Sequence, residues 1–136
     1  MQWLQRLPEW LARHGALMLV SLIPREGYSS CEQGEAMLVA AHGCCGSLGG
    51  AHLEWEAMAI ARALLEQGLR KRQTRFVLGP GAGAVRLLFE RIDADKALLW
   101  RGRAEAVARG SHLLRVCSDG DEESEWQLTL DAQCSE

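Results

Sequence analysis

The chain has 136 residues, of which 48% are hydrophobic and 24% charged, and its formal net charge is -3. This length suits one domain with its own core, and the balance of apolar and charged residues excludes a disordered class. A net negative charge without a basic stripe argues against nucleic acid as the main partner, and no apolar run is long enough to span a bilayer.

The spacing of apolar residues, together with the glycines and prolines, predicts helices and strands along the whole chain. In chain order these are a helix over 2–14, strands over 16–23 and 36–41, a helix over 51–67, strands over 75–78 and 85–90, a helix over 93–109, and strands over 112–117 and 125–130. Pro8 cannot donate a helical hydrogen bond, so the first helix is expected to start near Leu7 or to kink there.

The continuous apolar run ALMLVSLI at 16–23 indicates a strand buried on both faces. Gly68 is expected to end the second helix, and Asp93 to cap the third. The order of elements is not a strict alternation of strand and helix. It therefore favours an α+β fold, with a mixed β-sheet packed against about three helices, in a single domain over residues 1–136.

A glycine-rich turn, Gly46-Ser47-Leu48-Gly49-Gly50, leads directly into the helix predicted over 51–67. Amides at the start of a helix lie at the positive end of the helix dipole and suit a phosphate or another anion. Gly49 and Gly50 are expected to leave such amides exposed. Two glycines before a helix also form an ordinary turn, so the pattern alone does not require a ligand.

Glu54 follows in the first turn of that helix, between Leu53 and Met58 on its apolar face. A carboxylate turned toward the core needs a hydrogen-bonding partner. The favoured interpretation is that it accepts a backbone hydrogen bond and caps its own helix, and the alternative is that it accepts N–H groups of a bound ligand. Trp55 is predicted on the solvent or partner face, and Glu56 projects away from Glu54.

Five cysteines, odd in number and irregularly spaced, indicate free thiols in a reducing compartment. The N-terminus lacks the features of a signal peptide, so a cytoplasmic protein is expected. The adjacent pair Cys44 and Cys45 does not have zinc-site spacing, and no metal site is predicted. Activated thiols near a helix start would suit a sulfur carrier or thiol enzyme. Ser47 lacks convincing His and Asp partners, so a hydrolase triad is not supported.

The second glycine turn, Gly79-Pro80-Gly81-Ala82-Gly83, lacks the Gly-Lys-Ser/Thr ending of a nucleoside-triphosphate site and precedes a predicted strand. A hairpin turn is the favoured interpretation, and a loop close to a ligand is the alternative. The basic residues at 70–75 follow a helix end and are typical of a solvated face.

Three segments, residues 35–39, 43–57 and 75–80, resemble the N-terminal domain of the xanthine dehydrogenase accessory proteins, the XdhC/CoxI family. Around the first helix after the turn, the family pattern is close to Gly-Thr-Ile-Gly-Gly-Gly-x-Leu-Glu-x-x-Ala. This chain has Gly46-Ser47-Leu48-Gly49-Gly50-Ala51-His52-Leu53-Glu54-Trp55-Glu56-Ala57 there. The resemblance covers most of residues 16–92.

The resemblance implies a non-enzymatic accessory protein that binds molybdenum cofactor (molybdopterin) as cargo. Such proteins assist sulfuration of the cofactor by a cysteine desulfurase and its insertion into an apo-hydroxylase of the xanthine dehydrogenase type. A homodimer is compatible with this role, and the Rossmann-like second domain of the family is expected to be absent. The residues predicted to bind cofactor are Gly49, Gly50, His52, Glu54, Gly79 and Gly81, and those predicted to face a partner are Trp55 and Glu56.

The chain departs from the family pattern after Leu-Gly-Pro, where a Gln-Cys-Cys-Gly-Gly segment is usual. Here Gly81-Ala82-Gly83-Ala84 follows, and Ala51 replaces the third glycine of the first turn. The missing cysteines favour a second hypothesis, an interaction module that keeps the fold and has lost cofactor binding. The third hypothesis is a sulfur carrier that uses Cys44 or Cys45.

Overall fold

The computed structural model describes residues 2–23, 31–32, 36–79, 81, 83–116 and 124–129. The helices are α1 (Gln2–His14), α2 (Ala51–Gln67), the short 3-10 helix η1 (Ala94–Lys96) and α3 (Ala97–Ala108). The strands are β1 (Ala16–Ile23), β2 (Cys31–Glu32), β3 (Ala36–Ala40), β4 (Gly43–Gly46), β5 (Lys71–Gly79), β6 (Gly83–Asp93), β7 (His112–Val116) and β8 (Glu125–Thr129).

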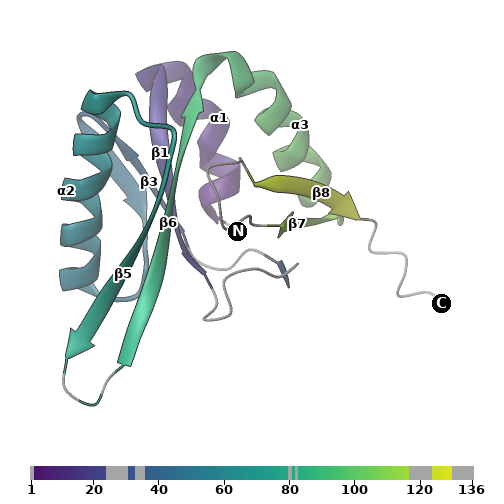
Figure 1. Cartoon of the computed structure of the whole chain (residues 1–136). Coiled ribbons are helices and arrows are strands. Elements are labelled where there is room, and N and C mark those ends of the chain that lie inside the picture. Colours follow the sequence, from purple (N-terminus) through teal and green to yellow (C-terminus); the bar gives the residue numbers. More distant parts are fainter. Residues whose placement is uncertain are drawn as a thin grey trace.

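These strands form two sheets, a larger one in the order β4-β3-β1-β6-β5 and a smaller one in the order β2-β7-β8. Every strand pair in the described part of the chain is antiparallel. Helix α2 covers one face of the larger sheet, and α1 and α3 lie on the other face beside the smaller sheet (Figure 1). The predicted α+β class with about three helices is therefore confirmed.

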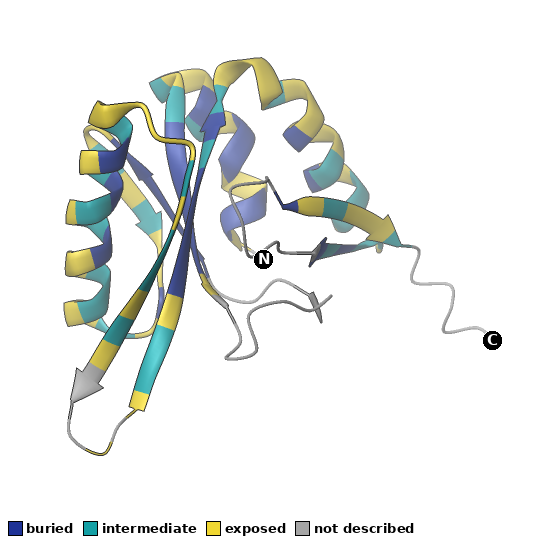
Figure 2. Ribbon diagram, viewed as in Figure 1, coloured by how far each residue is buried: buried dark blue, intermediate teal, exposed yellow. Residues whose placement is uncertain are grey.

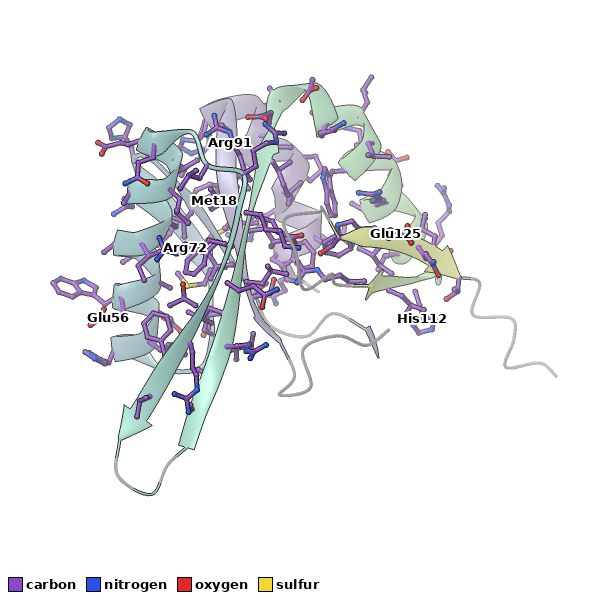
Figure 3. All side chains as sticks on the ribbon, viewed as in Figure 1. Met18, Glu56, Arg72, Arg91, His112 and Glu125 are labelled. Atoms are coloured by element: carbon purple, nitrogen blue, oxygen red, sulfur yellow. The ribbon has the colours of Figure 1, made fainter. Side chains whose placement is uncertain are left out.

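Strand β1 lies at the centre of the larger sheet and is buried on both faces, as its sequence predicts. Leu17 and Leu19 belong to the core under α1 and α3, whereas Met18 and Val20 belong to the core under α2. All four side chains are 0% exposed. Figure 2 shows the same double burial along the central strands, and Figure 3 shows Met18 between β1 and α2. Successive side chains of a strand point to opposite faces, so one apolar run serves two cores.

Helix α1 spans Gln2–His14, the range that the apolar spacing predicts, so of the two alternatives for Pro8 the start near Leu7 is wrong. Trp3 and Leu4 are buried in the core under α1 and α3, and Pro8 is buried within the helix. Burial of a large apolar side chain stabilises a fold by about 1.5–3 kcal/mol. Tertiary packing thus extends the helix across the proline. The free energy gained by burying two such side chains exceeds the free energy lost with one helical hydrogen bond.

Other boundaries lie close to the predicted ones, and the main differences concern the β5–β6 hairpin and β4. The second helix has the predicted limits, and Gly68 ends it with a φ of 74°. The hairpin of β5 and β6 is longer than predicted at both ends. Strand β4 was not predicted, because its sequence Gly-Cys-Cys-Gly carries no strand signal and only pairing with β3 makes it one. Cys117 and Leu130, predicted at strand ends, lie outside the described residues.

Gly46 ends β4 in a conformation that only glycine adopts easily, with a φ of 93°. A Cβ atom at this position would lie 2.3 Å from the carbonyl oxygen of Ala36 on the neighbouring strand. Close strand approach and a positive φ therefore coincide at the point where the chain leaves the sheet for α2. Glycine here fixes the exit of the turn that precedes the helix.

We expect Gly46→Ala to lower the free energy of unfolding by about 2–4 kcal/mol, because it adds both backbone strain and overpacking. Denaturant unfolding of the whole chain measures this. Gly102→Ala is the matched control, since Gly102 lies inside α3 with nothing within 4 Å of an added Cβ. The control is expected to raise stability by about 0.5–1 kcal/mol. Equal effects of the two substitutions would contradict the strain at Gly46.

Candidate functional site

The turn between β4 and α2 is anchored in the core by one of its own side chains. Leu48 is buried against α2, while Ser47 and Gly49 on either side of it are exposed. The Ser47 amide donates to the Ala36 carbonyl at 3.3 Å, and Gly49 has a φ of 92°. The glycine-rich turn is thus a defined loop held at both ends, because β3 and the α2 core each fix part of it.

The Glu54 carboxylate is the centre of this loop. Its Oε2 accepts a hydrogen bond from the Ser47 hydroxyl at 2.8 Å, from the Leu48 amide at 2.9 Å and from the Gly49 amide at 3.1 Å. The Gly49 amide also donates to the Ser47 hydroxyl oxygen at 3.0 Å. One carboxylate oxygen therefore organises three donors that precede its own helix.

These bonds stabilise the charged form of the carboxylate. The Ser47 hydroxyl, followed by the Leu48 amide, holds the pKa of Glu54 below its ordinary value, and the small degree of burial opposes this only in part. Hydrogen bonds to an ionised acceptor are stronger than neutral ones. At neutral pH this loop therefore contains a fixed negative charge.

Two expectations about this turn are wrong in the structure. The amides of Leu48 and Gly49 are not open to an anion, because Glu54 already accepts them. Glu54 itself does not turn into the core but reaches back along the chain to the loop. This arrangement corresponds to the favoured interpretation, in which the carboxylate caps the start of its own helix. Ser47, considered in the sequence only as a nucleophile, contributes instead as a loop donor.

The residues beyond this capped loop face outward. Gly50, the N-cap of α2, has an extended backbone, and an added Cβ would meet nothing within 4 Å. The His52 side chain is 89% exposed and lies 3.7 Å from the Glu56 carboxylate. Trp55 is 73% exposed, and Figure 3 shows Glu56 on the side of α2 away from the sheet. The start of α2 thus offers an exposed aromatic, an imidazole and a carboxylate.

The second glycine turn lies at the same end of the larger sheet as the start of α2 (Figure 1). Gly79 pairs with Gly83 across the β5–β6 hairpin, and Gly81 has a φ of 78° between them. The predicted hairpin is confirmed. The predicted cofactor-binding residues therefore share one end of the molecule without forming one closed site.

The two adjacent cysteines lie on the edge strand β4 rather than at the helix start. Cys44 is exposed and pairs across from Val39, whereas Cys45 is half-buried. Burial raises the pKa of the Cys45 thiol, and the nearby Arg6 guanidinium offsets this only in part. A raised pKa lowers the fraction of reactive thiolate. The environment of Cys45 therefore does not favour an activated nucleophile.

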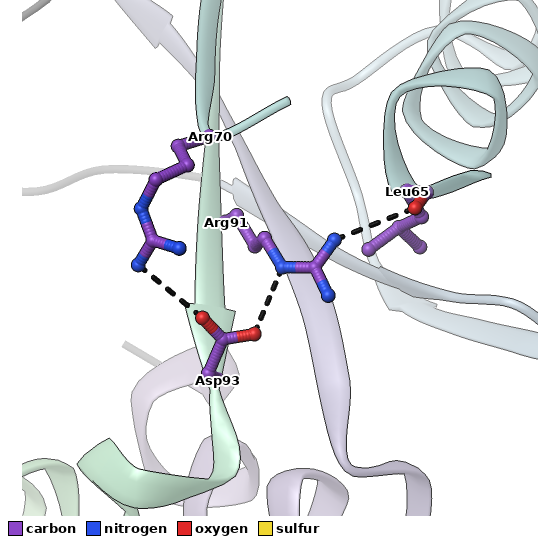
Figure 4. A network of polar contacts seen from close by, with 4 residues as sticks. All are labelled: Leu65, Arg70, Arg91 and Asp93. Atoms are coloured by element: carbon purple, nitrogen blue, oxygen red, sulfur yellow. Dashed lines mark hydrogen bonds and ion pairs between the residues drawn. The ribbon is translucent and has the colours of Figure 1, made fainter. Parts of the chain in front are cut away.

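At the opposite end of α2, Asp93 does not cap the third helix as predicted, since it forms no capping hydrogen bond. It accepts a bond from Arg91 at 2.8 Å and pairs with Arg70 at 3.2 Å (Figure 4). Burial raises the pKa of Asp93, but the two guanidinium groups outweigh it and the pKa falls. Arg91 also donates to the Leu65 carbonyl at 3.4 Å, which ties β6 to the end of α2.

Neither a metal centre nor a membrane span is evident in the part of the chain that the structure describes. No group of three or more His, Cys, Asp or Glu side chains there could hold a metal ion. No helix there combines the length and the apolar character required to cross a bilayer.

Comparison with known proteins confirms the resemblance stated from the sequence. The model of the XdhC and CoxI family matches residues 10–76. The segment contains β1, β3, β4, the glycine-rich turn and all of α2. Among curated proteins, none matches this chain.

One solved structure is similar over nearly the whole chain. It is described as a xanthine dehydrogenase from Bacillus halodurans, with a TM-score of 0.60 and 18% sequence identity. The match covers 93% of this chain and 44% of that protein. At this identity the similarity establishes the fold, and this chain spans less than half the length of its structural relative.

We expect Glu54→Gln to destabilise the protein at neutral pH, because a neutral amide oxygen accepts hydrogen bonds from the loop donors more weakly than the ionised carboxylate does. The pKa of Glu54 is lowered by folding, so its contribution is present above the pKa in the unfolded chain and is lost as pH falls through the lower folded value. The stability difference between wild type and Glu54→Gln should shrink from about pH 7 to about pH 3.

Denaturant unfolding at several pH values measures this difference. Glu56→Gln is the control, since Glu56 forms only an exposed contact with His52 and no bond to the loop. A Glu54→Gln effect that stays constant with pH, or that equals the effect of Glu56→Gln, would contradict the role of the Glu54 charge.

Proposed function

We propose, from the family whose model matches residues 10–76, that this protein is a non-catalytic accessory factor for a molybdenum hydroxylase of the xanthine dehydrogenase type. It binds molybdopterin as cargo, receives it for sulfuration by a cysteine desulfurase and transfers it to the apo-hydroxylase in the cytoplasm. The observation that carries this proposal is the position of the family match, which includes the glycine-rich turn and the whole of α2.

The geometry supports a specific place for the phosphate of such a cofactor. The first amides of a helix have no acceptor within the helix and lie at its positive end. Those of Leu48 and Gly49 are used by Glu54, so a phosphate would meet the amides that follow Gly50, beside the exposed imidazole of His52. Glu54 then acts by fixing the loop, and Gly79 and Gly81 approach the cargo from the hairpin at the same end of the sheet.

We expect Gly50→Asp to weaken molybdopterin binding at least about tenfold while leaving the fold intact, because a fixed charge next to the phosphate is repulsive. Aspartate and asparagine are both favourable N-cap residues, and the space at Gly50 is open. Gly50→Asn therefore matches the shape without the charge and is expected to retain binding. Fluorescence titration of the purified chain with released cofactor measures both variants.

Two results of this titration count against cofactor binding at the start of α2. One is the absence of a saturable signal with the wild-type protein. The other is equal affinity of the Asp and Asn variants, which would place the phosphate elsewhere.

One observation favours a second candidate, a module that binds a protein partner and no cofactor. Glu54 supplies internally the negative charge that an anionic ligand would otherwise bring to the loop amides. The surface beside this loop contains Trp55, which is 73% exposed on the solvent-facing side of α2. Tryptophan is enriched among the residues that dominate protein interfaces.

We expect Trp55→Ala to weaken capture of purified apo-hydroxylase or cysteine desulfurase at least about tenfold. The free energy of unfolding should not change, because the Trp55 side chain is largely exposed to solvent. Surface plasmon resonance with and without molybdopterin measures this. Val77→Ala, at another exposed apolar position on β5, is the matched control. Partner binding that needs no cofactor supports the second candidate, and wild-type affinity of Trp55→Ala would exclude this surface from either role.

A further inference from the structure

A cavity of about 140 Å³ lies on the α1 and α3 side of the larger sheet, away from Glu54. It is formed by the ends of β5 and β6, by η1 and α3, and by β8 with the residue before it. Its apolar wall contains Leu19, Trp100 and Trp126, and the first two of these belong to the core under α1 and α3. The cavity therefore lies between the smaller sheet and the rest of the molecule.

Among the described residues that line this cavity, cationic side chains outnumber carboxylates. Its described lining contains five cationic side chains, Arg70, Lys71, Arg91, Lys96 and Arg103, against two carboxylates, Glu90 and Asp93. Both carboxylates already have partners. Asp93 pairs with Arg91 and Arg70, and Glu90 lies 2.9 Å from Arg115 behind the wall. Neither carboxylate is paired with Lys96 or Arg103 among the contacts of the described residues.

Arg103 is the cation most in need of an anionic partner. Its guanidinium lies 4.5 Å from the ring centroid of Trp100 and 6.0 Å from that of Trp126. With the described residues it forms only these ring contacts, and it is half-buried. Burial lowers its pKa, which reflects the cost of removing this charge from water. An anion placed in the cavity would offset that cost.

Arg115, buried behind the lining residues Glu90 and Trp126, also has too few hydrogen-bond acceptors among the described residues. Its side chain is 1% exposed and stacks on Trp126 at 4.4 Å. Its Nε and Nη1 atoms have no hydrogen-bond partner in the part of the chain that the structure describes, and the pair with Glu90 is close but poorly directed. Buried donors without acceptors are uncommon in folded proteins. Arg115, which contacts the lining residues Trp126 and Glu90, therefore has buried donors that lack acceptors among the described residues.

We propose that this cavity binds a phosphate group, with Arg103 and Lys96 as its principal ligands. Pockets for drug-sized ligands occupy about 300–1,000 Å³, so the available volume suits a compact oxyanion rather than a whole nucleotide. Guanidinium groups match phosphate oxygens with directed, charge-assisted hydrogen bonds. The phosphate is either the free ion or the terminal group of a larger molecule that extends past Lys96 and Leu99 into solvent. This site does not depend on the cofactor proposal.

Calorimetric titration of the full chain with inorganic phosphate tests the site. Saturable binding that weakens with added salt is expected, and Arg103→Gln should reduce affinity about tenfold or more, as for loss of a hydrogen bond to a charged group. Lys96→Gln is the second variant, since Lys96 is exposed and its loss should leave the fold intact. Arg101→Gln removes the same charge from an exposed position on α3 outside the cavity lining and serves as control.

A parallel titration with phenyl phosphate distinguishes the two sources of the anion. Tighter binding of the ester than of phosphate indicates a larger ligand, and equal or weaker binding indicates free phosphate. The proposal is overturned if wild-type protein shows no saturable binding of either probe. It is also overturned if Lys96→Gln and folded Arg103→Gln bind as tightly as Arg101→Gln.

Discussion

The burial of β1 on both faces is the constraint on which the rest of this structure depends. Leu17 and Leu19 pack toward α1 and α3, and Met18 and Val20 pack toward α2. Because one strand serves both cores, neither helical layer can move without exposing apolar surface in the other. The two faces also separate two polar regions, the loop around Glu54 and the cationic cavity beside α3.

The loop around Glu54 illustrates how one charge can serve a fold and limit its ligands. A carboxylate that accepts three donors of the preceding loop gives the turn a single geometry. The same bonds remove two amides from the set that an incoming anion could use. Any phosphate at this end of α2 must therefore use the donors beyond Gly50, and a partner protein would meet Trp55 and His52 first. The two proposed roles, cargo binding and partner binding, therefore involve the same surface.

The opposite face is organised by aromatic rings and arginines. Trp3, Trp100 and Trp126 bring α1, α3 and β8 together, with ring centroids 4.9–6.2 Å apart. Arg103 and Arg115 lie over two of these rings, where cation–π attraction partly replaces lost hydration. Asp93 and Arg91 connect the end of α2 to β6 nearby (Figure 4). Positive charge is therefore concentrated where the small sheet meets the main body.

The sequence alone determined the features that depend on local periodicity and on glycine. It predicted β1, the limits of α2 with its Gly68 terminus, the hairpin, and the family whose model matches residues 10–76. Tertiary structure decided what depends on contacts between distant residues. Burial of Trp3 and Leu4 extends α1 past Pro8, pairing with β3 creates β4, and Arg70 and Arg91 draw Asp93 away from the cap. A helical wheel also could not predict where the Glu54 side chain points. A flexible carboxylate turns toward the available hydrogen-bond donors, whatever face of the helix its Cα lies on.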